Sequence, residues 1–288
     1  MDTFAILLIQ TLSSIAGLAL LSAGLAVIFG MMKVMNLAHG EFLMLGAYSV
    51  LVSVKMGANL FIAMFLIAPL VVGIIGAVVE RVIVRHLYGR LVDTLLATWG
   101  LSLFLVGIVT TFFGNTMEGI STPFGSFQIG QIQDSNYKFF IIFVASGLLL
   151  GVYLFFKYTQ WGLVARATMS NPAQASALGV NPDRVYTVTF AIGAALSGLA
   201  GAVLAPISGV LPTMGAAYVA KAFIIVIAGG EAILGGLVSA SVLFGSVNQT
   251  FTYLTSSVIG EVALLAAAVI LLRVMPEGIT GRIFRRSM

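Results

Sequence analysis

The chain of 288 residues is 60% hydrophobic and 8% charged, with a mean hydropathy of +1.10. Ordinary soluble domains carry about 25% charged residues, so this composition excludes such a domain and predicts a polytopic membrane protein. The net charge of +4 and the pI near 9.5 do not indicate nucleic-acid binding, because the basic residues lie at the ends of apolar runs, beside membrane lipid. The sequence contains no cysteine, which excludes disulfides, cysteine-ligated metal sites and a cysteine nucleophile.

Apolar runs long enough to cross a bilayer recur along almost the whole chain. About 20 apolar residues span the roughly 30 Å hydrocarbon core. We expect such helices at residues 5–31, 38–54, 60–80, 95–113, 139–156, 187–207 and 257–274. The first run is too long for the apolar core of a signal peptide and lacks a basic start, so we expect it to be retained.

One further apolar segment, residues 216–250, is interrupted by Gly229-Gly230-Glu231 and by Gly235-Gly236. Its first arm is short for a full crossing, which favours a re-entrant hairpin or a tightly turned helix pair. If this arm folds back, Lys221 and Glu231 can form an ion pair; alternatively each reaches a different interface, as Glu261 can. The expected fold is an all-α polytopic membrane protein, a single transmembrane domain over 1–288, with seven spans if the hairpin is re-entrant and nine if both arms cross.

Basic residues predict the orientation, because cytoplasmic connections are enriched in lysine and arginine. These residues concentrate in the connection 81–90, in the segment 157–186 and in the tail from Arg273 onward. All three are therefore expected inside. The connection 114–138 is polar and glycine-rich with a single lysine, so it is expected on the extracytoplasmic side. This arrangement places the N-terminus outside and the C-terminus inside.

Residues 33–48 interrupt the apolar sequence with polar side chains. Asn36, His39 and Glu41 follow the first run, and Gly40 between them permits a change of backbone direction. Polar groups inside a membrane protein need partners or water, so one interpretation is a helix break that lines a protein or water-filled cavity. The other is a short cytoplasmic turn between two spans, which accounts for Lys33 equally well.

Small residues recur at four-residue steps in two expected helices, at Ser22, Ala26 and Gly30 and at Gly193, Ser197 and Gly201. Such steps allow close helix contact in lipid, either as plain packing or as an interface that moves. Each of these helices leads into an interrupted segment, the second one at Pro206, Pro212 and Gly215. This weak similarity between the two parts of the chain leaves open an inverted repeat. In transporters, such repeats surround a substrate site near the middle of the membrane.

The segment 157–186 contains signals for a short helix. Asn171 is an N-cap residue, Pro172 suits the first helical position and Gly179 suits the C-terminal cap. A helix of only about seven residues is marginal in water, so we expect it to rest against something. Two surfaces remain open: a cytoplasmic partner whose acidic groups pair with Arg166 and Arg184, or the protein itself and the lipid headgroups.

Catalytic signatures are missing from the sequence, which has no HExxH, GxxxxGK[ST] or GxSxG motif. His39 with Glu41 is the best acid–base pair, but residues two positions apart do not share a face of a continuous helix. His86 lies among arginines at a membrane edge. We therefore expect a transport protein rather than an enzyme, without a metal site or cofactor, and any ATP hydrolysis in a separate subunit.

Four motifs resemble those of a known family. They are Met35-Asn36-Leu37-Ala38-His39-Gly40-Glu41, the loop from Arg166-Ala167 to Asn171 with Ala175 and Leu178-Gly179-Val180, the glycine-rich segment from Ala222 to Gly236, and Arg273-Val274-Met275-Pro276-Glu277-Gly278. Over essentially the whole chain, the sequence is similar to permease subunits of ABC importers for branched-chain amino acids and related small solutes. Many relatives have Gly-Gly-hydrophobic-Gly where this chain has Glu231 and Ala232, and the surroundings of Thr213 and of Ser257 to Gly260 resemble the urea and short-amide branch. The solute is therefore left open.

The resemblance implies a permease subunit in a bacterial cytoplasmic (inner) membrane. It implies as partners a second, homologous permease in a heterodimer, two cytoplasmic ATPase subunits and an extracytoplasmic solute-binding protein. It also implies that 166–180 holds the coupling helix that fits an ATPase cleft. The residues expected there are Arg166, Asn171, Pro172, Ala175, Leu178 and Gly179.

On this interpretation, a small solute released by the binding protein passes a cavity that opens alternately to the two sides, and branched-chain or other amino acids are the expected solutes. The side chains expected to line the path can hydrogen-bond an ammonium, a carboxylate or an amide, and they are Asn36, His39, Glu41, Tyr48, Thr213 and Tyr218. Two alternatives remain: a urea or short-chain amide permease, and an ion- or proton-coupled secondary transporter with Glu41 and His39 as a relay.

Overall fold

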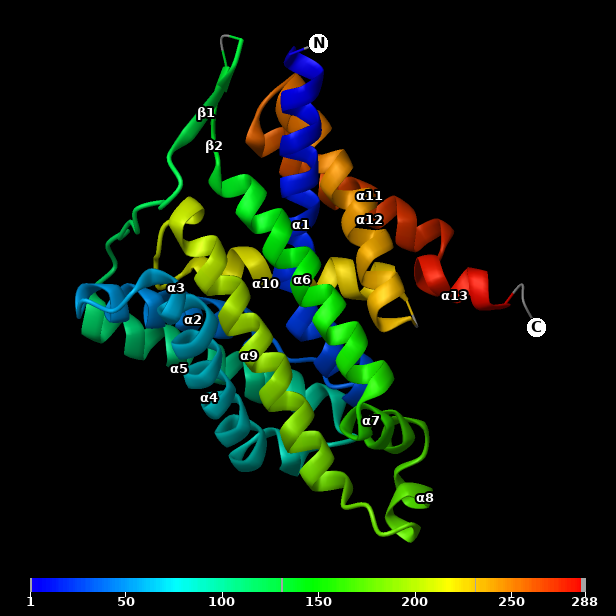
Figure 1. Ribbon diagram of the computed structural model, residues 1–288. Coiled ribbons are helices and arrows are strands. Elements are labelled where there is room, and N and C mark those ends of the chain that lie inside the picture. The colour runs from blue at the N-terminus through cyan, green and yellow to red at the C-terminus, as the bar shows by residue number, and fades with distance from the viewer. Residues whose placement is uncertain (1, 131, 231, 286–288) are drawn as a thin grey trace. The chain divides into compact units, whose positions relative to one another are not determined.

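The computed structural model describes residues 2–130, 132–230 and 232–285 (Figure 1). Its internal contacts divide the chain into two compact units, each built from segments that are distant in sequence. Unit 1 comprises Met1–Ser22, Ser121–Leu149 and Lys221–Met288, and unit 2 comprises Ala23–Ile120 and Leu150–Ala220. Three helices run from one unit into the other: α1 (Asp2–Met32), α6 (Tyr137–Tyr158) and α10 (Met214–Gly229).

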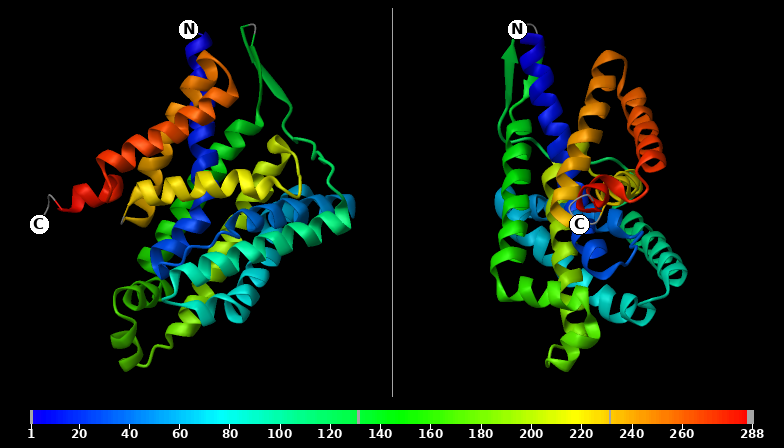
Figure 2. Two further views of the ribbon diagram at one scale, coloured as in Figure 1. Left: turned by 180° about the vertical axis from the view of Figure 1, so that it is seen from behind. Right: turned by 90° about the vertical axis from the view of Figure 1, so that its right-hand side faces the viewer.

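Unit 2 is organised around the packing of three helices, α2 (His39–Lys55), α4 (Ala68–Val82) and α9 (Pro182–Ser208), which lie side by side (Figures 1 and 2). The short helix α3 (Leu60–Ile62) and a π-helical turn, η1 (Ala63–Ile67), lead directly into α4. Pro69 at the start of α4 has no N–H to donate to the preceding turn, which accounts for the local change of hydrogen-bond pattern. Helix α5 (Leu91–Phe113) packs against α2.

Unit 1 contains a pair of neighbouring helices, α11 (Ile233–Leu254) and α12 (Ser257–Val274), followed by α13 (Gly278–Arg285) (Figure 2). The loop expected outside forms an antiparallel hairpin of β1 (Ser126–Ile129) and β2 (Ile132–Ser135). In β2, Asp134 accepts hydrogen bonds from Gln10 (3.0 Å) and Lys138 (2.6 Å). Burial alone would raise the pKa of Asp134, but these hydrogen bonds outweigh it and lower that pKa.

Seven helices in the described part of the chain are long and apolar enough to cross a membrane. They are Phe4–Met32, Leu60–Val82, Leu91–Phe113, Tyr137–Tyr158, Pro182–Ser208, Ile233–Leu254 and Ser257–Gly281. The expected all-α polytopic fold is confirmed, and six of the seven predicted spans coincide with helices of this set. The seventh, 38–54, forms α2, whose 17 residues reach about 26 Å, at the short end of the range for a crossing helix. The second arm of the predicted hairpin, α11, is a full-length helix of 22 residues.

The first arm of that hairpin is short, as expected: α10 has 16 residues and ends at Gly229. The backbone groups freed at this break are bound by one side chain from α13. The Thr280 hydroxyl donates to the Gly229 carbonyl (2.6 Å) and accepts from the Ala232 N–H (3.1 Å). Thr280 is buried, so its hydroxyl takes the place that water takes in a soluble protein.

Replacing Thr280 with valine is expected to lower the thermal unfolding midpoint of the purified protein in nanodiscs. The substitution leaves one carbonyl and one N–H without their partner, at a cost of about 1–3 kcal/mol for each buried group. Thr255→Val is the matched control, because the Thr255 hydroxyl is exposed and donates to the Phe251 carbonyl of its own helix (2.6 Å). Equal midpoints for the two variants would contradict this role of Thr280.

Lys221 has an ion-pair partner that the sequence did not indicate. The Lys221 ammonium contacts Glu261 on α12, with Nζ 2.6 Å from Oε1. Glu231, the partner considered from the sequence, lies outside the described residues. A carboxylate forty positions away is not predictable from local spacing, because it depends on how α10 and α12 come together.

Candidate functional site

The predicted break between α1 and α2 is present and spans 33–38. Lys33 has a φ of +55°, a left-handed conformation that is unusual for a residue other than glycine and that ends α1. Asn36 is fully buried, and its Oδ1 accepts a hydrogen bond from the Ala38 N–H (3.0 Å). The Leu37 N–H donates to Thr98 Oγ1 on α5 (3.1 Å). Side chains therefore satisfy the interrupted backbone.

His39 and Glu41, at the start of α2, are both buried and contact different helices. His39 Nδ1 lies 3.3 Å from Ser197 Oγ on α9. Glu41 Oε1 accepts a hydrogen bond from Ser102 Oγ on α5 (2.9 Å). The two side chains do not share a face, as their spacing predicted, so the arrangement does not make them an acid–base pair.

Helix α5 presents a row of hydroxyls that sequence reasoning missed. Thr94, Thr98 and Ser102 stand four positions apart and therefore on one face of the helix. Thr98 and Ser102 contact the break at Leu37 and Glu41. The available signal was this regular spacing of hydroxyls within an otherwise apolar run.

The second interrupted segment, 209–213, separates α9 from α10. Gly209 adopts a φ of +71°, and Val210 exchanges two backbone hydrogen bonds with Glu118 (2.9 and 2.8 Å), so this break is also satisfied. Beyond it, Gly215 lies against Gly40: a Cβ atom on either glycine would overlap the backbone of the other. The helices that follow the two breaks therefore contact each other through the backbones of Gly40 and Gly215, beside the Glu41 carboxylate.

The six residues predicted for the path lie at three places. Asn36, His39 and Glu41 cluster at the first break, while Thr213 is exposed and Tyr218 half-buried at the second. Tyr48 lies further along α2, with its ring 4.8 Å from that of Phe113. The contact of Gly40 with Gly215 brings the two breaks together, but lining of one path by all six side chains stays a prediction.

Two buried polar atoms of the first break have no hydrogen-bond partner among the described residues. Among the residues that the structure describes, none hydrogen-bonds Glu41 Oε2 or Asn36 Nδ2, although both side chains are at least 97% buried. Burying an unpaired polar group is costly. A carboxylate oxygen accepts and an amide nitrogen donates, so this pair complements a molecule that carries both an ammonium and a carboxylate.

The segment predicted to couple to a partner folds as two helices, α7 (Gln160–Ser170) and α8 (Pro172–Ala177). The predicted caps of α8 are confirmed: Asn171 Oδ1 accepts from the Gln174 N–H (3.1 Å), Pro172 occupies the first position, and Gly179 follows the helix with a φ of +86°. Helix α7 was not predicted. Its start is capped by Thr159, whose hydroxyl accepts from the Gly162 N–H (3.0 Å).

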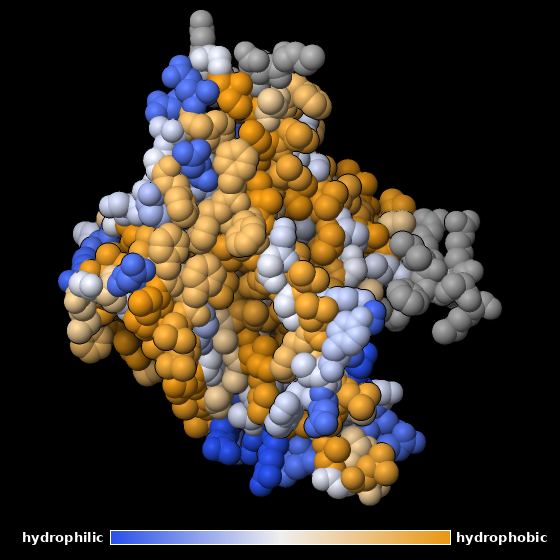
Figure 3. Space-filling view, viewed as in Figure 1, coloured by the Kyte–Doolittle hydropathy of each residue, from blue (hydrophilic) through white to orange (hydrophobic). Residues whose placement is uncertain are grey.

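Side chains of this coupling segment differ sharply in exposure. Ala175 is 4% exposed, whereas Leu178 is 86% exposed at the tip. Arg166 is also exposed, and its Nε donates to the Gly162 carbonyl of its own helix (3.3 Å). Figure 3 shows that hydrophobic residues cover most of the visible face, and that hydrophilic residues gather at the end of unit 2 that carries α8 and the start of α9.

A polar cluster fixes the neighbouring connection between α4 and α5 against α9. Buried Glu80 accepts a hydrogen bond from the Tyr88 hydroxyl (2.5 Å) and lies 3.5 Å from Arg85 Nε. Arg85 also donates to Thr187 Oγ1 (2.7 Å), and the Tyr88 ring packs edge-on against Tyr186. Burial and the Glu80 hydrogen bond raise the pKa of Tyr88, so the phenol remains a donor.

Comparison with known proteins identifies the family of this chain. The family model described as the permease component of the branched-chain amino acid transport system matches residues 7–275. The chain belongs to this family. The match covers both breaks and the coupling segment, and with seven apolar helices it establishes a multi-pass permease subunit of the inner membrane.

Individual relatives agree with the family. The high-affinity branched-chain amino acid transport system permease protein LivH of Escherichia coli is 29% identical over 92% of this chain and 91% of its own length. BraD of Pseudomonas aeruginosa, with the same description, is 28% identical over the same shares. Among solved structures, PsaBC from Streptococcus pneumoniae in complex with Fab matches 93% of this chain and 90% of that chain, with 16% identity and a TM-score of 0.49.

Proposed function

We propose that this permease forms the translocation path for branched-chain amino acids in an ATP-driven importer. Its path runs along the two breaks, with Asn36, His39 and Glu41 from the first and Thr213 and Tyr218 from the second. The observation that carries the proposal is the meeting of the breaks at Gly40 and Gly215, beside the buried Glu41 carboxylate. Interrupted helices that meet inside a transporter are a common way to expose polar groups to a solute.

The conformational change that moves the solute is driven by separate subunits. The sequence has no phosphate-binding loop, so ATP binding and hydrolysis belong to two partner ATPases that dock on α8 and its tip. A second permease completes the membrane part, and an extracytoplasmic binding protein delivers the solute. ATP binding then shifts the equilibrium between two packings of the helices, because it favours one of them.

The test is ATP hydrolysis by the complex purified with its partners in nanodiscs. Leucine together with the binding protein is expected to stimulate hydrolysis, and the permease alone in liposomes is expected to transport nothing under an ion gradient. Glu41→Gln keeps the shape of the side chain and its contact with Ser102 but removes the charge. We expect it to reduce stimulation by leucine about tenfold, the effect of roughly 1.4 kcal/mol.

Each rival predicts a different result in the same assay. Stimulation by urea or a short amide instead of leucine would assign the chain to that branch. Gradient-driven transport by the isolated permease would make it a secondary transporter. The exposed Glu261→Gln variant is the control for Glu41→Gln, because both replace a carboxylate in a membrane helix.

A further inference from the structure

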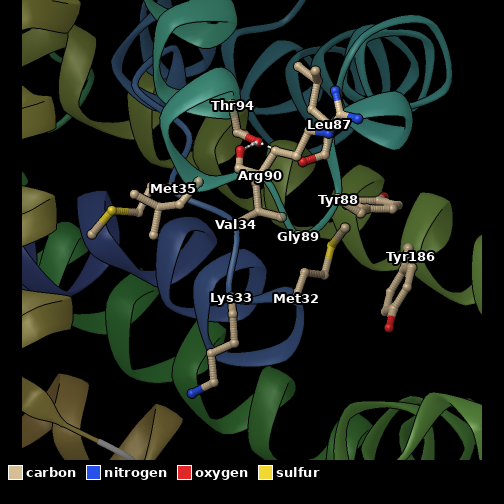
Figure 4. Close-up of a pocket in the computed structure, with 11 residues that line it drawn as sticks. Met32, Lys33, Val34, Met35, Leu87, Tyr88, Gly89, Arg90, Thr94 and Tyr186 are labelled. Atoms are coloured by element: carbon tan, nitrogen blue, oxygen red, sulfur yellow. Dashed lines mark hydrogen bonds between the residues drawn. The ribbon is translucent and has the colours of Figure 1, made fainter.

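A cavity of about 310 Å³ lies immediately before the first break in unit 2 (Figure 4). Its walls come from the end of α1 and the following residues 32–35, from the turn between η2 (Val84–Leu87) and α5, and from the start of α9. This volume is at the lower end of the range for small-molecule sites. The basic residues of the surrounding connections place the cavity on the expected cytoplasmic side.

Apolar and polar groups both line the cavity, with apolar surface in slight excess. Met32, Val34, Met35 and Leu87 contribute aliphatic or thioether surface, and Tyr88 contributes an aromatic ring. Figure 4 shows Met32 extending toward Tyr88, whereas the Lys33 side chain extends away from Tyr88. Methionine side chains adapt to irregular shapes, so this wall suits aliphatic groups of somewhat different form.

The cavity reaches the first hydroxyl of the row along α5. Thr94 lines the cavity and stands one turn before Thr98, which binds the break at Leu37. Ser102, one turn further, binds Glu41. A single helix face therefore leads from the buried carboxylate to the cavity, with a hydroxyl at every turn.

The wall opposite the break is held rigidly. The Tyr88 hydroxyl is bound to buried Glu80, and its ring packs against Tyr186, 5.1 Å between centroids. Thr94 Oγ1 donates to the carbonyls of Leu87 (3.0 Å) and Arg90 (2.8 Å), which fixes the turn before α5. A cavity whose shape is set by such contacts is suited to selecting a ligand by its form.

We infer that this cavity is a second station for the solute, in which the aliphatic side chain of an amino acid is held after the molecule has passed the break. The inference rests on the proposed function and adds to it a site and a selection rule. The polar groups at 36–41 recognise what all amino acids share, and the aliphatic and thioether part of the cavity wall distinguishes branched or long aliphatic side chains from glycine and from urea.

The absence of cysteine from the sequence allows a direct test. Met32→Cys places a single thiol in the cavity wall of the assembled transporter in inside-out membrane vesicles. We measure its alkylation by a membrane-impermeant maleimide with leucine, glycine or urea. Leucine at about twice its Kd is expected to slow the reaction about threefold, because the free fraction of the site falls to one third. Glycine and urea are expected to leave the rate unchanged.

Met169→Cys on α7 is the matched control, since it places the same reporter in a cytoplasmic segment outside the cavity. Its rate should not respond to leucine. Equal rates with and without leucine at Met32→Cys would overturn the inference, as would protection by a fatty acid but not by leucine, which would identify a lipid site. Leucine uptake by cells with the same variant separates the proposed function from the cavity site. Uptake without protection of the Met32→Cys thiol by leucine refutes only the cavity site. Absence of uptake with the unsubstituted protein refutes the proposed function.

Discussion

Gly201→Leu is expected to prevent unit 2 from folding. A Cβ atom on Gly201 would already overlap the carbonyl of Leu43 on α2, and the larger side chain has no space on that face of α9. One turn earlier, Gly198 packs against Val72 and the Ala68 carbonyl of α4. Overpacking a close contact costs about 1–3 kcal/mol when neighbours can move, and more where the obstacle is backbone. We expect almost no monodisperse protein after extraction into detergent.

Gly107→Leu supplies the control for this prediction. Gly107 also lies in a membrane helix, α5, but a Cβ atom there meets nothing within 4 Å. The two substitutions add the same side chain and the same hydropathy, so any difference reports the helix contact alone. Similar yields and unfolding midpoints for the two variants would show that α2 and α9 do not depend on this close approach.

Hydropathy and small-residue spacing predicted much of this architecture, because both are local properties of the chain. The steps at Gly193, Ser197 and Gly201 anticipated close packing of α9, and the caps around Asn171 anticipated α8. The full crossing length of α11 was not predicted. The glycine pairs at 229–230 and 235–236 indicated short hairpin arms, whereas α11 begins at Ile233 and continues through the second pair to Leu254.

The site was predicted only in part, for a similar reason. The polar residues of the first break could be found because they interrupt an apolar run. Their partners could not: Ser102 is 61 positions from Glu41, and Ser197 is 158 positions from His39. Hydroxyls are common in membrane helices, where they also bond their own backbone, so a single serine or threonine carries little information until the helices are placed.

Deleting 171–176 is expected to abolish ATP-driven uptake while leaving the rest of the protein folded. Among the described residues of α8, Ala175 is the buried one, so little packing is lost with the helix. The tip at Leu178, by contrast, is 86% exposed and is displaced by the deletion. If the ATPases transmit their closure through this tip, uptake by proteoliposomes falls to background, whereas the unfolding midpoint of the permease changes little.

A point substitution tests the contact of the tip with the ATPases without removing any residues of α8. Leu178→Asp keeps α8 and its caps but places a charge where an apolar side chain would be buried against the partner, and a charge buried in an interface without a partner is strongly unfavourable. Met56→Asp is the control, because Met56 is 82% exposed in the connection after α2, on the side opposite the ATPases in the expected orientation. Stimulated ATP hydrolysis should fall at least tenfold for Leu178→Asp only, which corresponds to about 1.4 kcal/mol of coupling. Full uptake by the deletion variant would mean that the driving force enters the permease elsewhere, and the exposed tip would then need another explanation.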